Sequence, residues 1–396
     1  MPQNSEIEYL VGSEEIANIM PNVSALIPFS EMSTHFLNEV SKSILNNPAA
    51  RQYPDVITFA FWCRKAAILE KQKPYPNLQN RLGKGVIFHI APSNVPVNFA
   101  FSLATGIIAG NANIVRVPSK EFVQVDIITQ AIYSSLQMYP DMQSRICLVR
   151  YGHDKAVTDF FSSLCDVRVI WGGDSTIASI RNSPLPARAT EVVFADRYSF
   201  SIINADYYLS CSNKEKIAQD FYNDTYLNDQ NACTSPQLVM WCGTQIQRAK
   251  ELFWQSLHDL LVKRYDLKPV QAVGKLSALC RLAIDTNASV ELVEDNLIVR
   301  LNINQLDVIL MDYKYHSGFF IEYDLKELRD IIPMCNRKCQ TISYLGEEAE
   351  AIHTCISTYA PAGVDRIVPL GKTMEFALVW DGYDLIERMT RIISCI

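Results

Sequence analysis

The sequence of 396 residues lacks a hydrophobic run long enough to cross a membrane. Its longest apolar stretch, residues 95–110, is interrupted by Asn98 and by glycines. It falls short of the roughly 20 residues that a membrane helix needs, so a buried helix is expected there. The first eight residues are acidic and polar, unlike the basic and then apolar start of a signal peptide. We therefore expect a cytoplasmic protein without a transmembrane segment.

The chain also lacks an excess of positive charge. Its formal net charge is −7, which argues against a nucleic-acid-binding surface. The 11 cysteines come without a secretion signal and indicate reduced thiols rather than a disulfide framework. Cys335 and Cys339 are close in sequence, but no second pair with the spacing of zinc ligands accompanies them. No metal site is expected.

Apolar runs and helical patterns alternate between residues 81 and 205. This alternation predicts an α/β fold with parallel βαβ units, that is, a Rossmann-type parallel-sheet domain that binds a nucleotide at the carboxyl ends of its strands. Ser119, after Pro118, is a plausible N-cap for the second helix. The expected strands are 86–91, 113–117, 146–150, 167–171 and 200–204, and the expected helices are 97–108, 121–138, 154–164 and 175–182.

The length of the chain indicates at least two domains. Residues 1–80 show mixed helical patterning and are expected to form a layer for packing or oligomerisation. Residues 206–363 are expected to form a second α/β domain, and residues 364–396 return to strand and then helix. Beyond residue 205 we expect strands at 236–242, 297–301, 308–311, 318–323 and 340–345, and helices at 214–227, 245–262 and 347–358.

Cys233 is the first candidate for chemistry. It lies in the polar stretch NDQNACTSPQ (residues 228–237), between a helical run and a strand-like run. Free cysteine is among the most buried residue types, so a cysteine kept for packing would lie among hydrophobic residues. Catalytic residues, in contrast, are frequent in loops. Cys233 is therefore a candidate nucleophile.

Asn94 is the second candidate. It lies in HIAPSNVP (residues 89–96), at the end of the first strand of the nucleotide domain. Two prolines stiffen this turn, so the amide of Asn94 is suited to stabilising an oxyanion. The alternative is an asparagine that only forms the turn.

Two further segments are suited to binding a dinucleotide. Arg116, Ser119 and Lys120 lie where a strand ends before a helix, a place where anions are favoured; the alternative for the two cations is a pair of solvated surface side chains. Gly172 and Gly173 form a turn between a strand and a helix, where backbone can approach a phosphate or nicotinamide closely. The usual GxGxxG fingerprint is absent there.

Taken in order, these segments resemble the aldehyde dehydrogenase superfamily, and more closely its acyl-CoA reductase branch of the LuxC fatty acid reductase type. The first 80 residues contribute nothing to the resemblance. Each motif is short, but their number and order make the signal specific. They are HIAPSNVP (89–96), AGNANIVRVPS (109–119), WGGD (171–174), NAC (231–233), KCQT (338–341), GVDRIVPLG (363–371) and WDGYD (380–384).

The resemblance implies an aldehyde dehydrogenase-like fold and a specific reaction. Cys233 would attack an acyl thioester, acyl-CoA or acyl-protein, to form an acyl-cysteine. Asn94 and the backbone N–H of Cys233 would form the oxyanion hole. A reduced nicotinamide would then deliver hydride, and an aldehyde would leave. The superfamily mostly forms dimers or tetramers, so a homo-oligomer is expected, and an acyl-transferring protein is a candidate partner.

One departure from the superfamily favours reduction over oxidation. Aldehyde-oxidising members carry a general-base glutamate followed by paired glycines on a strand before the cysteine. Here the comparable region reads VVFADRYS (residues 192–199), and Glu191 beside it lacks that context. Loss of a deacylating base suits a reductase, which must keep water from the acyl-enzyme.

The cofactor residues depart as well. Many NAD-using relatives place Lys and then Glu around the adenosine ribose, where this chain has Arg116 and Lys120. Lys120 would attract a 2′-phosphate, so NADPH is expected. Gln340 falls where relatives use a glutamate to hold the nicotinamide ribose. No histidine is near Cys233 in sequence, although His89 could approach it in space.

Two other functions are consistent with the sequence. The first is an aldehyde dehydrogenase that oxidises an aldehyde to an acid. The second is a non-catalytic subunit that binds acyl chains or an acyl-transferring protein, against which the presence of both Cys233 and Asn94 argues.

Overall fold

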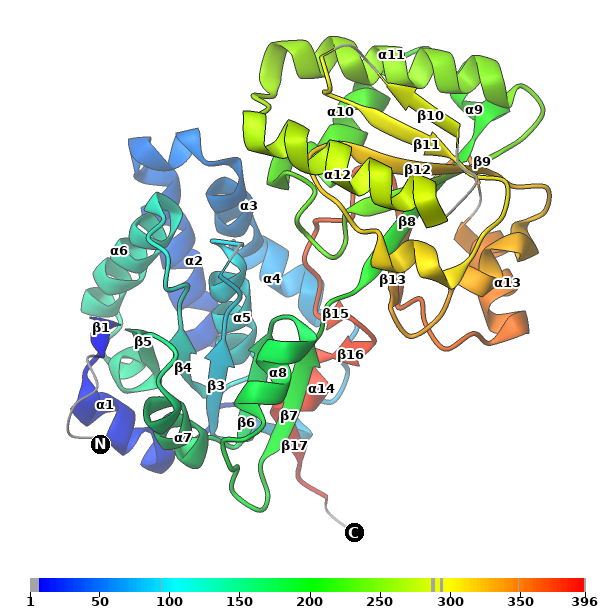
Figure 1. Cartoon of the computed structure of the whole chain (residues 1–396). Helices are drawn as coiled ribbons and strands as arrows, with labels where there is room; N and C mark the ends of the chain where they lie inside the picture. The colour runs from blue at the N-terminus through cyan, green and yellow to red at the C-terminus, as the bar shows by residue number, and fades with distance from the viewer. Residues whose placement is uncertain (1–6, 94, 286–288, 293–294, 348, 395–396) are drawn as a thin grey trace. The chain divides into compact units, whose positions relative to one another are not determined.

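The chain folds into two units, each built around its own β-sheet (Figure 1). The computed structural model describes residues 7–93, 95–285, 289–292, 295–347 and 349–394. Unit 1 comprises Met1–Ala195 and Ala377–Ile396, and unit 2 comprises Asp196–Phe376. The boundary lies before the expected one near residue 205 because the strand β8 (Tyr198–Asn204) pairs with strands of unit 2.

Unit 1 holds a six-stranded sheet in the order β1-β5-β4-β3-β6-β7, parallel except for the β1–β5 pair. Strands of a parallel sheet are covered on both faces and read as continuous apolar runs; all five positions of β3 are buried. The predicted parallel α/β architecture is confirmed. The strands are β1 (Glu8–Val11), β3 (Val86–Ile90), β4 (Ala112–Arg116), β5 (Ile146–Arg150), β6 (Val167–Trp171) and β7 (Thr190–Phe194).

One face of this sheet packs against α1 (Glu14–Ile19), α7 (Lys155–Leu164) and α8 (Asp174–Ile180). The amphipathic sequence of helix α7 explains its position on the sheet. Val157 and Phe161, one turn apart, are buried in the core, whereas Lys155 and Asp159 form an ion pair on the solvent side.

The helices of the first 80 residues belong to unit 1. Helix α5 (Asn98–Ile108) contacts β3 and β4, and α2 (Glu31–Asn46) packs against α5 and α6 (Val123–Met138). Helices α3 (Pro54–Trp62) and α4 (Lys65–Gln72) pack on α2. The helices of the expected layer thus pack within unit 1, to whose sheet β1 adds an edge strand that the sequence did not indicate.

The predicted C-terminal return segment, 364–396, is divided between the units. Its strand β14 (Arg366–Pro369) joins the sheet of unit 2. The remainder returns to unit 1 through the β15–β16 pair (Val379–Trp380, Tyr383–Asp384), α14 (Leu385–Met389) and β17 (Thr390–Ile392), which pairs with β2 (Arg81–Gly83).

Unit 2 holds a seven-stranded sheet in the order β10-β11-β12-β9-β8-β13-β14, parallel except at β10. Besides β8 and β14, its strands are β9 (Pro236–Cys242), β10 (Ser289–Leu292), β11 (Val299–Asn302), β12 (Phe319–Asp324) and β13 (Cys339–Leu345).

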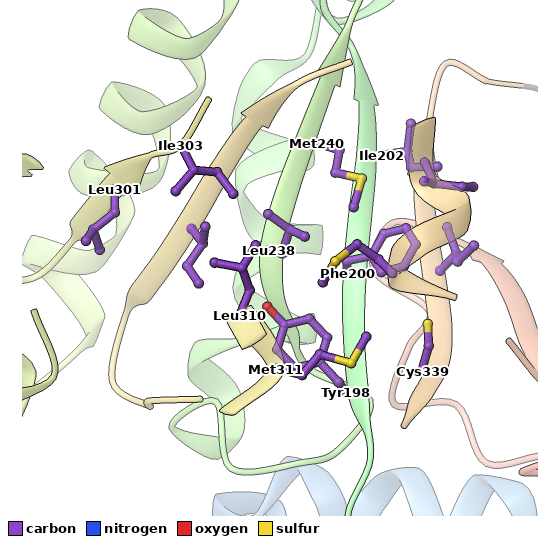
Figure 2. Close-up of a cluster of buried hydrophobic side chains, with 14 of the residues drawn as sticks. Tyr198, Phe200, Ile202, Leu238, Met240, Leu301, Ile303, Leu310, Met311 and Cys339 are labelled. Carbon is purple, nitrogen blue, oxygen red and sulfur yellow. The ribbon is translucent and has the colours of Figure 1, made fainter. Parts of the chain in front are cut away.

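Alternate residues of these strands enter two different cores. Leu238 and Met240 of β9 lie in the cluster shown in Figure 2, whereas Val239 and Trp241 lie in the cluster on the opposite face. The first cluster is covered by α12 (Pro269–Asp285) and α13 (Ala349–Tyr359), and the second by α9 (Ala205–Ser210), α10 (Lys214–Asp224) and α11 (Ile246–Arg264).

Three local predictions differ from the structure. Residues 308–311, expected as a strand, lie in the 3₁₀ turn η6 (Val308–Asp312), which buries Leu310 and Met311 without joining the sheet. Helix α12 was not predicted. Ser119 does not cap α6, because the chain bends at residues 119 and 120 and the helix begins only at Val123. Within the ranges described, no helix is both long and apolar enough to cross a membrane.

Candidate active site

Cys233 lies in the loop that leads into β9, at the amino end of the parallel strands of unit 2. Its side chain is partly exposed. Its backbone oxygen accepts a hydrogen bond of 2.7 Å from Oγ of Ser199 in the neighbouring strand β8. The amide of Ser235 donates to the carbonyl of Ala232 at 3.0 Å. The predicted loop position of Cys233 is thus part of a hydrogen-bonded turn fastened to the sheet.

Gln230 fastens the same loop from the other side. It is fully buried, and its amide bonds to the backbone of Pro236 and Phe319, at the starts of β9 and β12. Nδ1 of His316 lies 2.9 Å from the carbonyl oxygen of Gln230. Sequence reasoning missed both residues. His316 carries no local signal, because only the pairing of β12 with β9 brings it to the loop.

A third anchor comes from the GVDRIVPLG segment. Asp224, buried at the end of α10, accepts hydrogen bonds from the amides of Gly371 (2.6 Å) and Thr373 (3.0 Å) and from Oγ1 of Thr373 (2.9 Å). Burial raises the pKa of its carboxyl to about 6, although these bonds favour the charged form. These bonds attach residues 371–373 to the end of α10, shortly before the Cys233 loop begins.

Met374, next along this segment, contacts the cysteine loop directly. Its sulfur accepts Nδ2 of Asn228 at 3.7 Å and Oγ1 of Thr234 at 3.2 Å. Thr234 is the residue after Cys233. The loop is therefore bounded by β8, by the start of β12 and by the segment around Met374.

Unit 1 contains a cavity of about 340 Å³ beside helices α7 and α8. Arg116, at the carboxyl end of β4, lines it together with His153 and Lys155. The remaining lining is mainly polar: Asp154, Thr158, Ser175, Thr176, Ser179, Ile180, Asn182 and Ser183. The cavity thus lies near carboxyl ends of the parallel sheet, where open α/β sheets bind ligands.

Arg116 is held in place in this cavity. Its guanidinium donates to the carbonyl oxygens of Tyr151 (3.3 Å) and Gly152 (2.9 Å) and lies 4.5 Å from the centre of the Tyr151 ring. A guanidinium fixed in this way is suited to binding a phosphate because its remaining N–H groups keep their direction.

The other predicted cofactor residues of unit 1 are not among the residues that line the cavity. Ser119 and Lys120 are exposed and are not among the lining residues; the Lys120 ammonium lies 5.2 Å from the centre of the Phe122 ring. Gly172 and Gly173 precede α8, whose first turn carries Ser175 and Thr176 into the lining. The space that a Cβ at Gly173 would occupy is open, so a phosphate could approach the backbone there closely.

Gln340, predicted to hold the nicotinamide ribose, lies in unit 2. It belongs to β13, is fully buried, and its backbone oxygen accepts the amide of Asp365 at 2.8 Å. Asn94, the predicted oxyanion residue, lies outside the described residues. Both roles stay predictions.

The sequence left open whether His89 approaches Cys233, and the surroundings of His89 argue against it. It is fully buried in unit 1, with Nδ1 2.7 Å from Oγ of Ser102 and Nε2 3.1 Å from Oδ1 of Asn113. Burial lowers the pKa of the ring to about 4. It is a neutral core histidine with both nitrogens engaged.

Two carboxylates, Glu191 and Asp196, lie in or beside the stretch where aldehyde-oxidising relatives carry their general base, and both form ion pairs. Glu191, in β7, accepts Arg168 at 2.7 Å and Arg181 at 2.7 Å. Asp196 accepts Lys314 at 2.7 Å. In the part of the chain that the structure describes, no group of three or more metal-binding side chains is found.

The family comparison identifies much of the chain. A family model described as acyl-CoA reductase (LuxC) matches residues 64–288. The chain is 25% identical over 321 residues to a long-chain acyl-protein thioester reductase of Vibrio harveyi, covering 78% of this chain and 64% of that protein. It is 23% identical over 265 residues to long-chain acyl-protein thioester reductase 2 of Photobacterium leiognathi, covering 66% and 49%. The chain thus spans about half to two thirds of these relatives.

Solved structures share the fold at low identity. Lactaldehyde dehydrogenase from Escherichia coli has 13% identity and a TM-score of 0.66, with 98% of this chain and 95% of that chain covered. A 3,6-anhydro-L-galactose dehydrogenase in complex with NADP has 12% identity and a TM-score of 0.65, with 98% and 96% covered. The fold is therefore that of the aldehyde dehydrogenases, as the motifs implied.

Proposed function

The chain belongs to the acyl-CoA reductase (LuxC) family, and we propose that it reduces an acyl thioester to an aldehyde with NADPH, through an acyl-cysteine on Cys233. The observation that carries the proposal is the loop of Cys233. It lies within the family match and presents a partly exposed thiol in a turn that is anchored on three sides.

Cys233 would do the covalent chemistry. Its thiolate attacks the thioester carbonyl, and the tetrahedral intermediate collapses with expulsion of the donor thiolate, which takes up a proton. The acyl group is now a thioester of Cys233 and stays electrophilic. Reduced nicotinamide supplies the hydride. When the aldehyde leaves, Cys233 takes back the electron pair of the C–S bond as a thiolate. Asn94 is the proposed donor to the oxyanion.

The cavity of unit 1 fits the adenosine end of a dinucleotide. It carries a fixed guanidinium, two further basic side chains and several hydroxyl groups. In Rossmann-type domains an arginine in this region accommodates a 2′-phosphate, whereas an acidic residue binds the free ribose hydroxyl. Asp154, the acidic residue of the lining, caps α7 through the amides of Ala156 and Val157. We therefore favour NADPH, with Arg116 rather than Lys120 as the residue that would bind the 2′-phosphate, because of the two only Arg116 lines the cavity.

Reduction is favoured over oxidation because the chain lacks the general-base glutamate with paired glycines that aldehyde-oxidising relatives carry; the comparable region reads VVFADRYS (residues 192–199). Hydrolysis of an acyl-cysteine needs a base to activate water. Without that glutamate, and with Glu191 engaged by Arg168 and Arg181, the acyl group would persist for hydride transfer. The names of the relatives make an acyl group carried by a protein a candidate donor beside acyl-CoA.

The test is mass spectrometry of the purified protein after exposure to acyl-CoAs of graded chain length, followed by addition of NADPH. We expect a thioester adduct on the peptide that contains Cys233, and its loss as free aldehyde when NADPH is added. Cys280→Ala is the matched control, because Cys280 is an exposed thiol of the same unit. Absence of both an adduct and NADPH oxidation across the series would overturn the proposal. Formation of acid from aldehyde and NADP⁺, without the reverse reaction, would favour a dehydrogenase.

A further inference from the structure

Two short left-handed segments face each other at the base of the Cys233 loop. Asp229 and Gln230 have φ angles of 52° and 58°, and Ser317 and Gly318 have φ angles of 62° and 84°. The amide of Ser317 donates to the carbonyl of Asp229 at 3.3 Å. A left-handed residue other than glycine costs roughly 1–2 kcal/mol, so such segments persist only where their surroundings hold them.

The amide of Gln230 holds both segments. Its Nε2 donates to the carbonyl oxygens of Pro236 (2.9 Å) and Phe319 (3.1 Å). Its Oε1 accepts the amides of Gly318 (3.0 Å) and Phe319 (3.2 Å). These bonds use both hydrogens and both acceptor positions of the amide. No other side chain of similar size matches this pattern, because a glutamate cannot donate and a methionine can do neither.

His316 holds the backbone of the same residue. Its Nδ1 lies 2.9 Å from the carbonyl oxygen of Gln230, which also accepts Nε2 of Gln237 at 3.3 Å. A carbonyl only accepts, so Nδ1 carries the hydrogen. The carbonyl of Gln230, three residues before Cys233, therefore accepts hydrogen bonds from two side chains.

Helix α12 supports the arrangement from outside. Gln271 donates to the carboxylate of Asp229 at 2.7 Å, and the ammonium of Lys275 donates to the carbonyl of Ser317 at 2.7 Å. The hydroxyl of Tyr265 also bonds to Asp229. Both left-handed segments are thus braced by one helix, which explains how the fold maintains them.

We propose that Gln230 and His316 are positioning residues for Cys233. Together they hold the loop in its left-handed conformation before the acyl donor arrives, so that the thiol does not have to be reoriented during attack. The inference rests on the proposed role of Cys233 as nucleophile. It assigns His316 a hydrogen-bonding role through the carbonyl of Gln230, and no proton transfer.

The experiment measures the rate of alkylation of Cys233 by iodoacetamide against pH, read from the Cys233 peptide by mass spectrometry. His316→Leu removes the donor and should lower the rate by roughly tenfold, as one lost hydrogen bond allows. His316→Asn keeps an N–H near the position of Nδ1 without a group that titrates. It should stay within about threefold of the wild type, with an unchanged pH profile. Gln230→Glu should be alkylated more slowly than wild type, because a carboxylate oxygen would replace the Nε2 donor and repel the carbonyl oxygens of Pro236 and Phe319.

His353→Leu serves as the control, because His353 is an exposed histidine of α13 in the same unit. If His316→Asn were as slow as His316→Leu and had lost the pH dependence, His316 would be a proton acceptor and the proposal would be wrong. Wild-type rates in His316→Leu would also overturn it. Should His316→Leu fail to fold, His316→Asn and Gln230→Glu still decide the question.

Alkylation requires neither an acyl donor nor a nicotinamide, so the two proposals fail separately. If the variants behave as expected but no acyl adduct forms, the positioning role stands and the proposed reaction falls. If acyl adducts form and His316→Leu alkylates at the wild-type rate, the reaction stands and the positioning role falls.

Discussion

Acidification below about pH 6.5 should destabilise unit 1, because His89 would have to accept a proton in a site built for the neutral ring. Its surroundings define the tautomer. Nδ2 of Asn113 donates to the carbonyl of Asn111, so Oδ1 of Asn113 is left to accept Nε2–H of His89. The indole of Trp171 donates to Oγ of Ser102, so the hydroxyl of Ser102 donates to Nδ1 of His89. A second ring proton would face this hydroxyl.

The size of the effect follows from the pKa. Burial lowers the pKa of His89 from 6.5 to about 4, a difference of 6.5 − 4 = 2.5. At roughly 1.4 kcal/mol per pKa unit, keeping the ring neutral is worth about 3.5 kcal/mol in the free energy of unfolding. Between these two pKa values the folded state binds fewer protons than the unfolded state. The contribution is therefore complete above pH 6.5 and is lost as the pH falls towards 4.

Urea unfolding at a series of pH values from about 7 to about 4.5 would measure this contribution. A short pulse of hydrogen–deuterium exchange, always at the same labelling pH, would follow unfolding of the β3 and β4 peptides separately from that of unit 2. His89→Gln lacks the titrating ring. It should be less stable than wild type near pH 7, by about 1–2 kcal/mol for the lost hydrogen bond and packing. The wild type should lose about 2.5 kcal/mol more than the variant over this range.

Parallel stability curves for the two proteins would refute the assignment of His89 as a buried neutral histidine. The same variant also tests its separation from catalysis. Because both ring nitrogens bond within unit 1, His89→Gln should leave alkylation of Cys233 within about twofold of the wild-type rate at neutral pH.

Three other changes test the site and the fold. Cys233→Ala should abolish the acyl adduct while the dissociation constant of NADPH, measured by calorimetry, stays within about twofold; an adduct that persists would remove Cys233 from the role. Arg116→Ala should raise that dissociation constant by about tenfold or more, the effect of a lost charge-assisted hydrogen bond, and exposed Lys120→Ala by less than about threefold. The reverse order would place the phosphate at Lys120. Gly106→Ala should lower the stability of unit 1 by about 2–3 kcal/mol, because its Cβ would collide with Asn113 in the core, and an unchanged urea midpoint would contradict this packing.

The strands of unit 1 were readable from the sequence because of where they lie. Strands β5 and β6 coincide with the predicted ranges 146–150 and 167–171; β3 ends one residue before its predicted range does, and β4 is shifted by one residue at both ends. A parallel strand buried on both faces is an apolar run bounded by turns, so its signal is local.

Elements that depend on distant partners were misplaced or missed. Strand β8 looked like a further strand of the nucleotide domain, because an apolar run does not specify which sheet it joins; its pairing with β9 and β13 decides that. Strand β1 is an edge strand whose partner β5 lies more than a hundred residues away. Residues 308–311 have strand-like composition but form a 3₁₀ turn, which buries only Leu310 and Met311.

The sequence by itself determined the parallel α/β architecture, the family resemblance and the choice of Cys233, because hydrophobic periodicity, turn residues and a cysteine in a polar loop are local features. Only the tertiary structure decided which groups are engaged. It bonded both nitrogens of His89 in a core, paired Glu191 with two arginines, and brought His316 to the carbonyl of Gln230. Each of these outcomes depends on hydrogen-bond partners from other strands and helices, and the order of strands in a sheet is a property of the folded chain.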